Sequence, residues 1–149
     1  MSYEQLKLQN QLCFPFYAVS RLIIRAYQDD LDKLGITYPQ YLVLMVLWEN
    51  DLQTVNEIGE RLILNTNTIT PLLKRMETME FLERKHSIID QRKVIVGLTE
   101  KGENLKEHAA DIPLRLMNKM QIEPTESTIV EIMALKKLLN DLIKLLKEV

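Results

Sequence analysis

The chain has 149 residues, 46% of them hydrophobic and 27% charged, which is long enough for one domain with a substantial core. No stretch approaches the roughly 20 consecutive apolar residues that span a bilayer, and the N-terminal residues lack a signal-peptide pattern. We therefore expect a cytoplasmic protein without membrane contact. The net charge of −2 argues weakly against nucleic-acid binding. However, residues 1–64, 65–96 and 97–149 carry net charges of −3, +2 and −1, so the middle segment is basic.

The first part of the chain is predicted to be helical. Apolar residues recur at helical spacing from Leu6 to Leu34, and Gly35 supplies a stop. Pro15 interrupts this pattern, because a proline inside a helix removes a hydrogen bond but is tolerated at the first helical position. We expect either one long helix or two pieces, with the main helix beginning at Pro15.

Capping residues mark three further helices. Thr37-Tyr-Pro-Gln40 and Thr54-Val-Asn-Glu57 have the spacing of capping boxes and open helices that reach Trp48 and about Leu62. Asn65-Thr-Asn-Thr68 supplies N-cap candidates for the next helix. Its predicted apolar face consists of Ile69, Leu72, Leu73, Met76 and Met79.

After this helix the hydrophobic period changes from helix-like to strand-like. Residues 81–85 and 93–98 are short strand-like runs, joined by a polar turn at 86–92. A β-hairpin directly after a helix pair is typical of a winged helix-turn-helix, so the predicted fold is mainly α with a small β-hairpin wing. Thr99 is predicted to cap a further helix, bent or interrupted at Pro113.

A last helix is predicted to start at Pro124. Its apolar residues cover more than one face, whereas a helix packed only on its own domain usually has a single apolar stripe. The sequence therefore predicts a subunit interface there.

The polar face of the third capped helix has the residue types of a DNA-recognition helix. Such a helix places short hydrogen-bonding side chains in the major groove and longer basic ones near phosphates. The candidates for these two roles are Asn65, Thr66, Asn67, Thr68 and Thr70 for the groove, with Lys74 and Arg75 for phosphates. In the wing they are Arg84, Lys85, Arg92 and Lys93, with Asp90 holding Arg92 in place. The alternative for the helix alone is an ordinary capped surface helix with a solvated charged face.

These residues resemble the MarR family of dimeric transcriptional regulators over essentially the whole chain. The resemblance is carried by Leu62–Glu77, by Asp90-Gln-Arg92, which matches the D-x-R element of the family's wing, and by Leu98-Thr-Glu-Lys-Gly102. It implies a homodimer that binds a pseudo-palindromic operator on double-stranded DNA and releases it on meeting a small molecule or an oxidant.

The resemblance also implies a division of the chain. Residues 1–36 and 100–149 would form the dimerisation helices, and residues 37–99 the winged helix-turn-helix. Asn65-Thr66-Asn67 stands where close relatives often have Asp-Ser-Gly, so operator preference is not transferred.

The single cysteine, Cys13, cannot form an intramolecular disulfide, so it is a buried filler, a reactive thiol or an intermolecular partner. The segments 10–17 and 34–41 resemble the organic-hydroperoxide-sensing, OhrR-type branch of the family. The resemblance implies that Cys13 is the oxidised residue and that Tyr27 and Tyr38 of the partner subunit hydrogen-bond its thiolate. Tyr17 matches a further aromatic of the pocket.

Without a second cysteine, oxidation would pass from a sulfenic acid to a mixed disulfide with a low-molecular-weight thiol, to a sulfenamide, or to irreversible overoxidation. The predicted function is therefore a DNA-binding regulator, acting as a repressor, that is switched by oxidation of Cys13 by an organic hydroperoxide. Pro15 stands where the family has an ordinary helix-former, so the backbone near Cys13 is expected to differ locally.

Two alternative functions differ from this prediction. In the first, the fold is the same but a small aromatic ligand binds a pocket lined by Tyr17, Tyr38 and Trp48, with Cys13 structural. In the second, the protein is a thiol peroxidase, which is disfavoured because the chain has no resolving cysteine. His86 and His108 show no metal-ligand spacing, and no Gly-rich phosphate loop occurs, so we expect no cofactor, no metal and no enzyme activity.

Overall fold

The computed structural model describes residues 3–149. Two short 3-10 helices, η1 (Glu4–Leu6) and η2 (Leu8–Asn10), precede the long helix α1 (Cys13–Lys33). Of the two predicted alternatives, one long helix or separate pieces, the structure has separate pieces, and the main helix begins at Cys13 and not at Pro15. Pro15 is the third helical residue, where a backbone N–H would have no acceptor within the helix, so its missing N–H costs no hydrogen bond.

The end of α1 is fixed by its own backbone. Gly35 has a φ of +68°, and its N–H donates to the Asp32 carbonyl at 3.0 Å. The Ile36 N–H donates to the Leu31 carbonyl at 3.1 Å, which completes a Schellman motif. Leu31 and Ile36 are both buried, so the turn that ends the helix also joins the core.

The next three helices are α2 (Tyr38–Glu49), α3 (Val55–Leu62) and α4 (Thr66–Thr78). Their predicted caps are confirmed. The Thr37 N–H donates to Gln40 Oε1 at 2.8 Å, and the Glu57 N–H donates to Thr54 Oγ1 at 3.2 Å. At α4, the Thr68 N–H donates to Asn65 Oδ1 at 3.0 Å.

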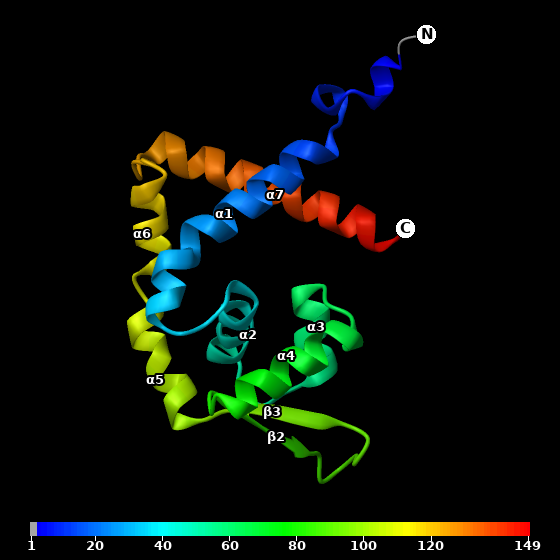
Figure 1. Cartoon of the computed structure of the whole chain (residues 1–149), viewed down its shortest axis with the longest axis vertical. Helices are drawn as coiled ribbons and strands as arrows, with labels where there is room; N and C mark the ends of the chain where they lie inside the picture. Colours follow the sequence, from blue (N-terminus) through cyan, green and yellow to red (C-terminus); the bar gives the residue numbers. More distant parts are fainter. Residues whose placement is uncertain (1–2) are drawn as a thin grey trace. The chain divides into compact units, whose positions relative to one another are not determined.

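The wing contains β2 (Leu82–His86) and β3 (Val94–Leu98), which pair antiparallel with Leu82 opposite Leu98 and His86 opposite Val94. A two-residue strand, β1 (Gln53–Thr54), pairs with the other edge of β3, so the sheet order is β1-β3-β2. The sequence predicted the hairpin but missed β1, because this strand has only two residues and one of them, Thr54, is the N-cap of α3. The loop end of the hairpin projects beyond α2, α3 and α4 (Figure 1).

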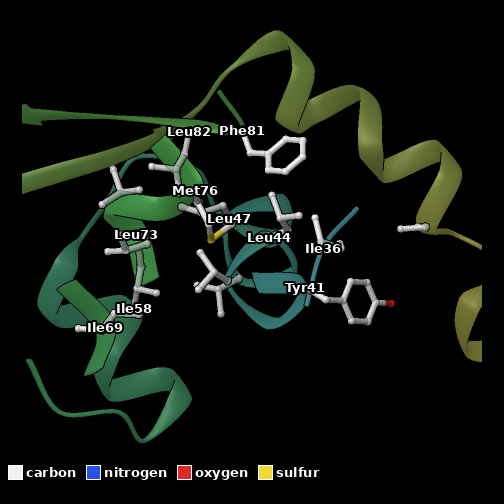
Figure 2. Packing of buried hydrophobic residues seen from close by; sticks show 14 of the residues in the cluster. Ile36, Tyr41, Leu44, Leu47, Ile58, Ile69, Leu73, Met76, Phe81 and Leu82 are labelled. Carbon is white, nitrogen blue, oxygen red and sulfur yellow. The ribbon is translucent and has the colours of Figure 1, made fainter. Parts of the chain in front are cut away.

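The core lies where α2, α3 and α4 meet the sheet. Figure 2 shows side chains of α2 and α4 pointing toward one another, with Phe81 and Leu82 at the start of the wing beside them. The buried residues of α4 are Ile69, Leu73 and Met76. This spacing leaves the opposite face of α4 exposed, as the sequence predicted.

The chain divides into two compact units, one extending to Ile112 and the other formed by Pro113–Val149. The first unit ends with α5 (Glu100–Ala109), whose cap at Thr99 is confirmed: the Gly102 N–H donates to Thr99 Oγ1 at 3.1 Å. Helix α6 (Ile112–Lys119) begins at the boundary, so the predicted interruption near Pro113 is also confirmed.

The second unit is dominated by α7 (Glu126–Lys147), which has no buried residue. It begins at Glu126, with Thr125 as its N-cap, and not at Pro124 as predicted. The Thr125 side chain accepts from the Thr128 N–H at 3.2 Å, whereas proline has no side-chain acceptor to cap a helix. The largely exposed apolar side chains of α7 include Val130, Met133, Leu138, Leu145 and Leu146.

Candidate DNA interface and sensor residues

The N-terminal turn of α4 presents a row of short polar side chains to solvent. Thr66, Asn67, Thr68 and Thr70 are all exposed, while Ile69 between them is buried. Asn65 Oδ1 accepts both the Thr68 N–H and the Thr68 hydroxyl, each at 3.0 Å. This turn is therefore ordered by its cap, and the positive end of the helix dipole lies beside these polar groups.

Farther along α4, Lys74 and Arg75 are also exposed. They lie two turns beyond the cap, at the distance where long basic side chains reach phosphates on either side of a groove.

Arg84 of β2 forms a salt bridge with Glu77 of α4, and we call this pair the Glu77 clamp. Arg84 Nε and Nη2 donate to Glu77 Oε2 at 3.0 and 2.7 Å, and its backbone N–H donates to Glu77 Oε1 at 3.1 Å. These bonds hold the pKa of the Glu77 carboxyl below its usual value. Arg84 was predicted as a DNA contact, but its guanidinium is already engaged, which fits a residue that fixes the wing against α4.

The pairing of Glu77 with Arg84 was not predicted from the sequence. Residues seven apart in one helix share a face but lie about 10 Å apart along its axis, so the spacing does not predict a direct bond. It brings the two side chains together only because the turn after α4 folds β2 back along that helix.

The remaining basic residues of the wing are exposed. Asp90 Oδ1 accepts the Arg92 backbone N–H at 3.1 Å and Arg92 Nε at 3.2 Å, as the sequence predicted. The bonds from Arg92 lower the pKa of the Asp90 carboxyl. Arg92 is 91% exposed, so it is oriented by Asp90 and still open to a partner. Lys93 is exposed, and Lys85 pairs with Glu83 at 2.5 Å.

Cys13 is a free, exposed thiol at the first position of α1. Tyr17, one turn later on the same side of the helix, is 59% exposed, and the Arg21 guanidinium lies 5.5 Å from the centre of its ring. This end of α1 therefore presents a thiol and an aromatic ring together.

Tyr27 and Tyr38 form an aromatic cluster with a third tyrosine, Tyr41. The ring centres of Tyr27 and Tyr38 are 5.1 Å apart, and Tyr41 lies 6.0 Å from Tyr27 and 6.5 Å from Tyr38. Burial raises the pKa of all three phenols, so each stays protonated at neutral pH and is a hydrogen-bond donor. Tyr41 lies in the segment 34–41 that carries the resemblance, but no role was predicted for it from the sequence.

Within one chain the thiol and the tyrosines are far apart. Cys13 and Tyr27 are separated by 14 residues of the same helix, which corresponds to about 21 Å along its axis. Tyr38 is linked through Tyr41 to Trp48, whose ring is 6.2 Å from that of Tyr41. Tyr17 faces solvent near the opposite end of α1, so a ligand pocket formed by Tyr17, Tyr38 and Trp48 remains only a prediction.

Across residues 3–149, no helix combines the length and apolar character needed to cross a membrane. In that same part of the chain, no three His, Cys, Asp or Glu side chains gather as ligands for a metal ion.

The helix pair α3–α4 followed by the β2–β3 hairpin defines a winged-helix protein of the class that regulates transcription. The family model for the transcriptional regulators SarA and Rot matches residues 25–109, and the chain belongs to this family. The MarR-type regulator predicted from the sequence is confirmed at this level.

Individual relatives agree. The organic hydroperoxide resistance transcriptional regulator of Bacillus subtilis is 52% identical over 111 residues, covering 74% of this chain and 76% of the relative. AbfR of Staphylococcus epidermidis has been solved in several states. Its reduced form bound to DNA is 40% identical, covers 96% of this chain and 99% of AbfR, and has a TM-score of 0.72. Its disulfide form is 38% identical, with coverages of 98% and 96% and a TM-score of 0.64. The first of these relatives is thus a transcriptional regulator, and the second is a DNA-binding protein.

Proposed function

We propose that this chain is a homodimeric, DNA-binding transcriptional repressor whose operator binding is switched off when an organic hydroperoxide oxidises Cys13. The observation that carries the proposal is the free, exposed Cys13 at the start of α1, in a chain 52% identical to an organic hydroperoxide resistance regulator. A cytoplasmic location follows from this role, because the operator and the reducing thiols are there.

DNA would be bound by α4 and the wing. The exposed Thr66, Asn67, Thr68 and Thr70 enter the major groove, and Lys74 and Arg75 contact phosphates. Lys85, Arg92 and Lys93 of the wing add cationic contacts beside the groove. Arg84 acts through Glu77, by setting the angle between wing and α4.

A second copy of the chain would supply the rest of the assembly. Apolar residues of α1 and α7, such as Leu22 and Leu138, are 61% and 67% exposed, which is costly for a chain that works alone. A twofold dimer formed through these helices would place two copies of α4 about 34 Å apart, matching successive major-groove half-sites of a pseudo-palindromic operator.

The dimer would also complete the sensor. Since Cys13 and Tyr27 lie about 21 Å apart along one helix, Tyr27 could hydrogen-bond the thiolate only from the partner subunit. An antiparallel crossing of two α1 helices would bring Cys13 of one copy to Tyr27 and Tyr38 of the other. Both phenols are neutral donors, as that role requires.

The chemical step uses one hydroperoxide. The Cys13 thiolate attacks the terminal oxygen of the O–O bond and becomes a sulfenic acid, while the other oxygen leaves as an alkoxide that takes up a proton to become an alcohol. A low-molecular-weight thiol then attacks the sulfenic sulfur and expels water, leaving a mixed disulfide. The added group would be too large for the helix crossing and would separate the two copies of α4.

Gln40 offers a route from the sensor to the recognition helix. It is buried beside Tyr41, its Oε1 accepts the Thr37 N–H at 2.8 Å, and its Nε2 donates to Met79 Sδ at 3.3 Å. Because Met79 is the C-cap of α4, a displacement of the start of α2 is passed directly to the end of that helix.

The test uses a labelled duplex selected from a random-sequence library by the reduced wild-type protein. We expect tight binding that is lost after one equivalent of cumene hydroperoxide plus cysteine and is restored by dithiothreitol. The Cys13→Ser variant is the matched control and should bind with equal affinity in both conditions. Release of this variant by peroxide, or absence of binding by the reduced wild type, would overturn the proposal.

A further inference from the structure

The loop at the tip of the wing is held in one conformation by its own hydrogen bonds. The Ser87 N–H donates to the Lys93 carbonyl at 2.8 Å, and the Lys93 N–H donates to the Asp90 carbonyl at 2.9 Å. Ser87 Oγ accepts the N–H groups of Ile89 and Asp90, each at 3.3 Å. His86 Nδ1 also lies 2.9 Å from the Gln91 carbonyl. The tip is therefore an ordered turn.

Two isoleucine side chains project from this ordered turn into solvent. Ile88 and Ile89 are 101% and 98% exposed, so neither side chain packs against the hairpin. Turn positions usually hold Gly, Asn, Asp, Ser or Pro, whose backbones or side chains favour the turn. Two adjacent β-branched apolar residues contribute nothing of that kind. They present apolar surface in the loop, two and three residues after the end of β2.

Three exposed cations lie near this apolar tip, together with the Asp90 carboxylate that pairs with Arg92. Arg92 is 91% exposed and oriented by Asp90, and Lys85 and Lys93 are exposed on the same hairpin. An apolar tip flanked by cations complements the DNA minor groove, whose walls are the carbon atoms of deoxyribose and whose rims are phosphates. Apolar side chains that enter this groove are an established way for proteins to bind it.

We propose that Ile88 and Ile89 enter the minor groove beside the major-groove segment occupied by α4 and pack against its sugars. Arg92 anchors the loop electrostatically at the groove, and the two isoleucines add affinity that does not depend on salt. This inference rests on the proposed DNA binding, and it assigns the wing tip a contact of different chemistry from the basic residues.

The test replaces both isoleucines in the full-length reduced protein and measures affinity for the selected duplex over a series of salt concentrations. Ile88→Ser with Ile89→Ser should weaken binding roughly tenfold, because partial burial of two isoleucines is lost. The slope of log K against log salt should stay the same, since no cation is removed. Arg92→Ala should instead reduce that slope by about one.

Two controls make the result specific. The pair Ile88→Leu with Ile89→Leu keeps the apolar surface and should bind within about twofold of wild type. On a duplex shortened to remove the flanking base pairs, the wild type and the serine pair should bind equally. Equal affinity of the serine pair and the wild type on the long duplex would overturn the inference, as would an equal loss on both duplexes. Failure of the wild type to bind any duplex would instead refute the proposed function.

Discussion

Two regions of the molecule differ in whether one chain holds all their parts together. They are the proposed DNA-reading region, made of α3, α4 and the wing, and the proposed sensor region, made of Cys13, Tyr27 and Tyr38. In the first, the caps of α3 and α4, the bonds between Glu77 and Arg84, and the turn that orients Arg92 are all made locally. In the second, Cys13 is exposed near one end of α1 and the tyrosine cluster lies near the other. In the proposed function, one chain would be enough to form a DNA-reading surface but not a sensing site.

This difference has a consequence for regulation. A preformed reading surface is changed little by events elsewhere in its own fold, so its affinity for an operator depends mainly on how two copies are spaced. In the proposed function the sensor would be formed where the copies meet. An oxidisable residue at that junction would let a small chemical change act on the spacing of the two copies of α4.

The largest expected effect comes from breaking the reading region itself. A Cβ on Gly102 would lie 2.0 Å from the Phe81 carbonyl oxygen, and this oxygen already accepts the Thr99 N–H at 3.2 Å. Gly102→Ala should therefore destabilise the fold by about 3 kcal/mol or more and lower Tm by roughly 10 °C. Thermal unfolding followed by the fluorescence of Trp48, whose indole N–H donates to the Gly102 carbonyl, measures this effect.

Gly35→Ala is the matched control for that variant. Nothing lies within 4 Å of its added Cβ, so only the left-handed φ of +68° opposes the change. A loss of about 1 kcal/mol is expected. Similar losses for the two variants would mean that the close approach of α5 to Phe81 is not important for stability.

The parts of the fold that the sequence predicted well are those set by local chemistry. The caps at Thr37, Thr54 and Asn65 each need a side-chain oxygen three residues before a free N–H, and this requirement can be read directly from the sequence. The hairpin was predicted for a similar reason, because two short strand-like runs flank a seven-residue turn segment, although that segment carries Ile88 and Ile89. The exposed face of α4 followed from the period of its buried residues.

The parts that were missed depend on contacts between distant segments. Strand β1 exists only because β3 offers it an edge, and two residues carry no pattern of their own. Tyr41 joins the sensor tyrosines because α1 and α2 pack together, and Glu77 meets Arg84 because the chain reverses after α4. Cys13 and the predicted tyrosines were grouped by resemblance, and a single chain does not bring them together.

A smaller effect is expected in the sensor. Tyr27→Phe with Tyr38→Phe removes two hydroxyl donors and should slow oxidation of Cys13 by cumene hydroperoxide roughly tenfold, while leaving operator affinity of the reduced protein unchanged. The rate is measured by mass spectrometry of the thiol after quenching. A rate equal to that of wild type would remove the tyrosines from the mechanism.

Mixed dimers test whether the site is shared between copies. One copy carries Cys13→Ser with intact tyrosines, and the other carries Cys13 with both tyrosines changed to phenylalanine. If the tyrosines act across the interface, the one remaining thiol faces intact phenols and reacts at the wild-type rate. If they act within their own chain, it reacts as slowly as the phenylalanine variant.

The smallest effect is expected at the clamp between α4 and the wing. Glu77→Gln weakens the hold on Arg84 and should lower operator affinity by about threefold at pH 7, as the wing becomes less restrained. Because the pKa of Glu77 is lowered in the folded protein, its stabilising contribution is present above the usual glutamate range and is lost as the pH falls through the folded value. The wild type should therefore lose more stability than the variant on acidification.

Glu83→Gln provides the control on the same hairpin. It removes the partner of Lys85, but both side chains of that pair are largely exposed, so neither affinity nor acid sensitivity should change measurably. Equal behaviour of the two variants would show that the orientation of the wing does not depend on the Glu77 clamp. The reading region would then rely on packing of Phe81 and Leu82 alone to hold its hairpin against α4.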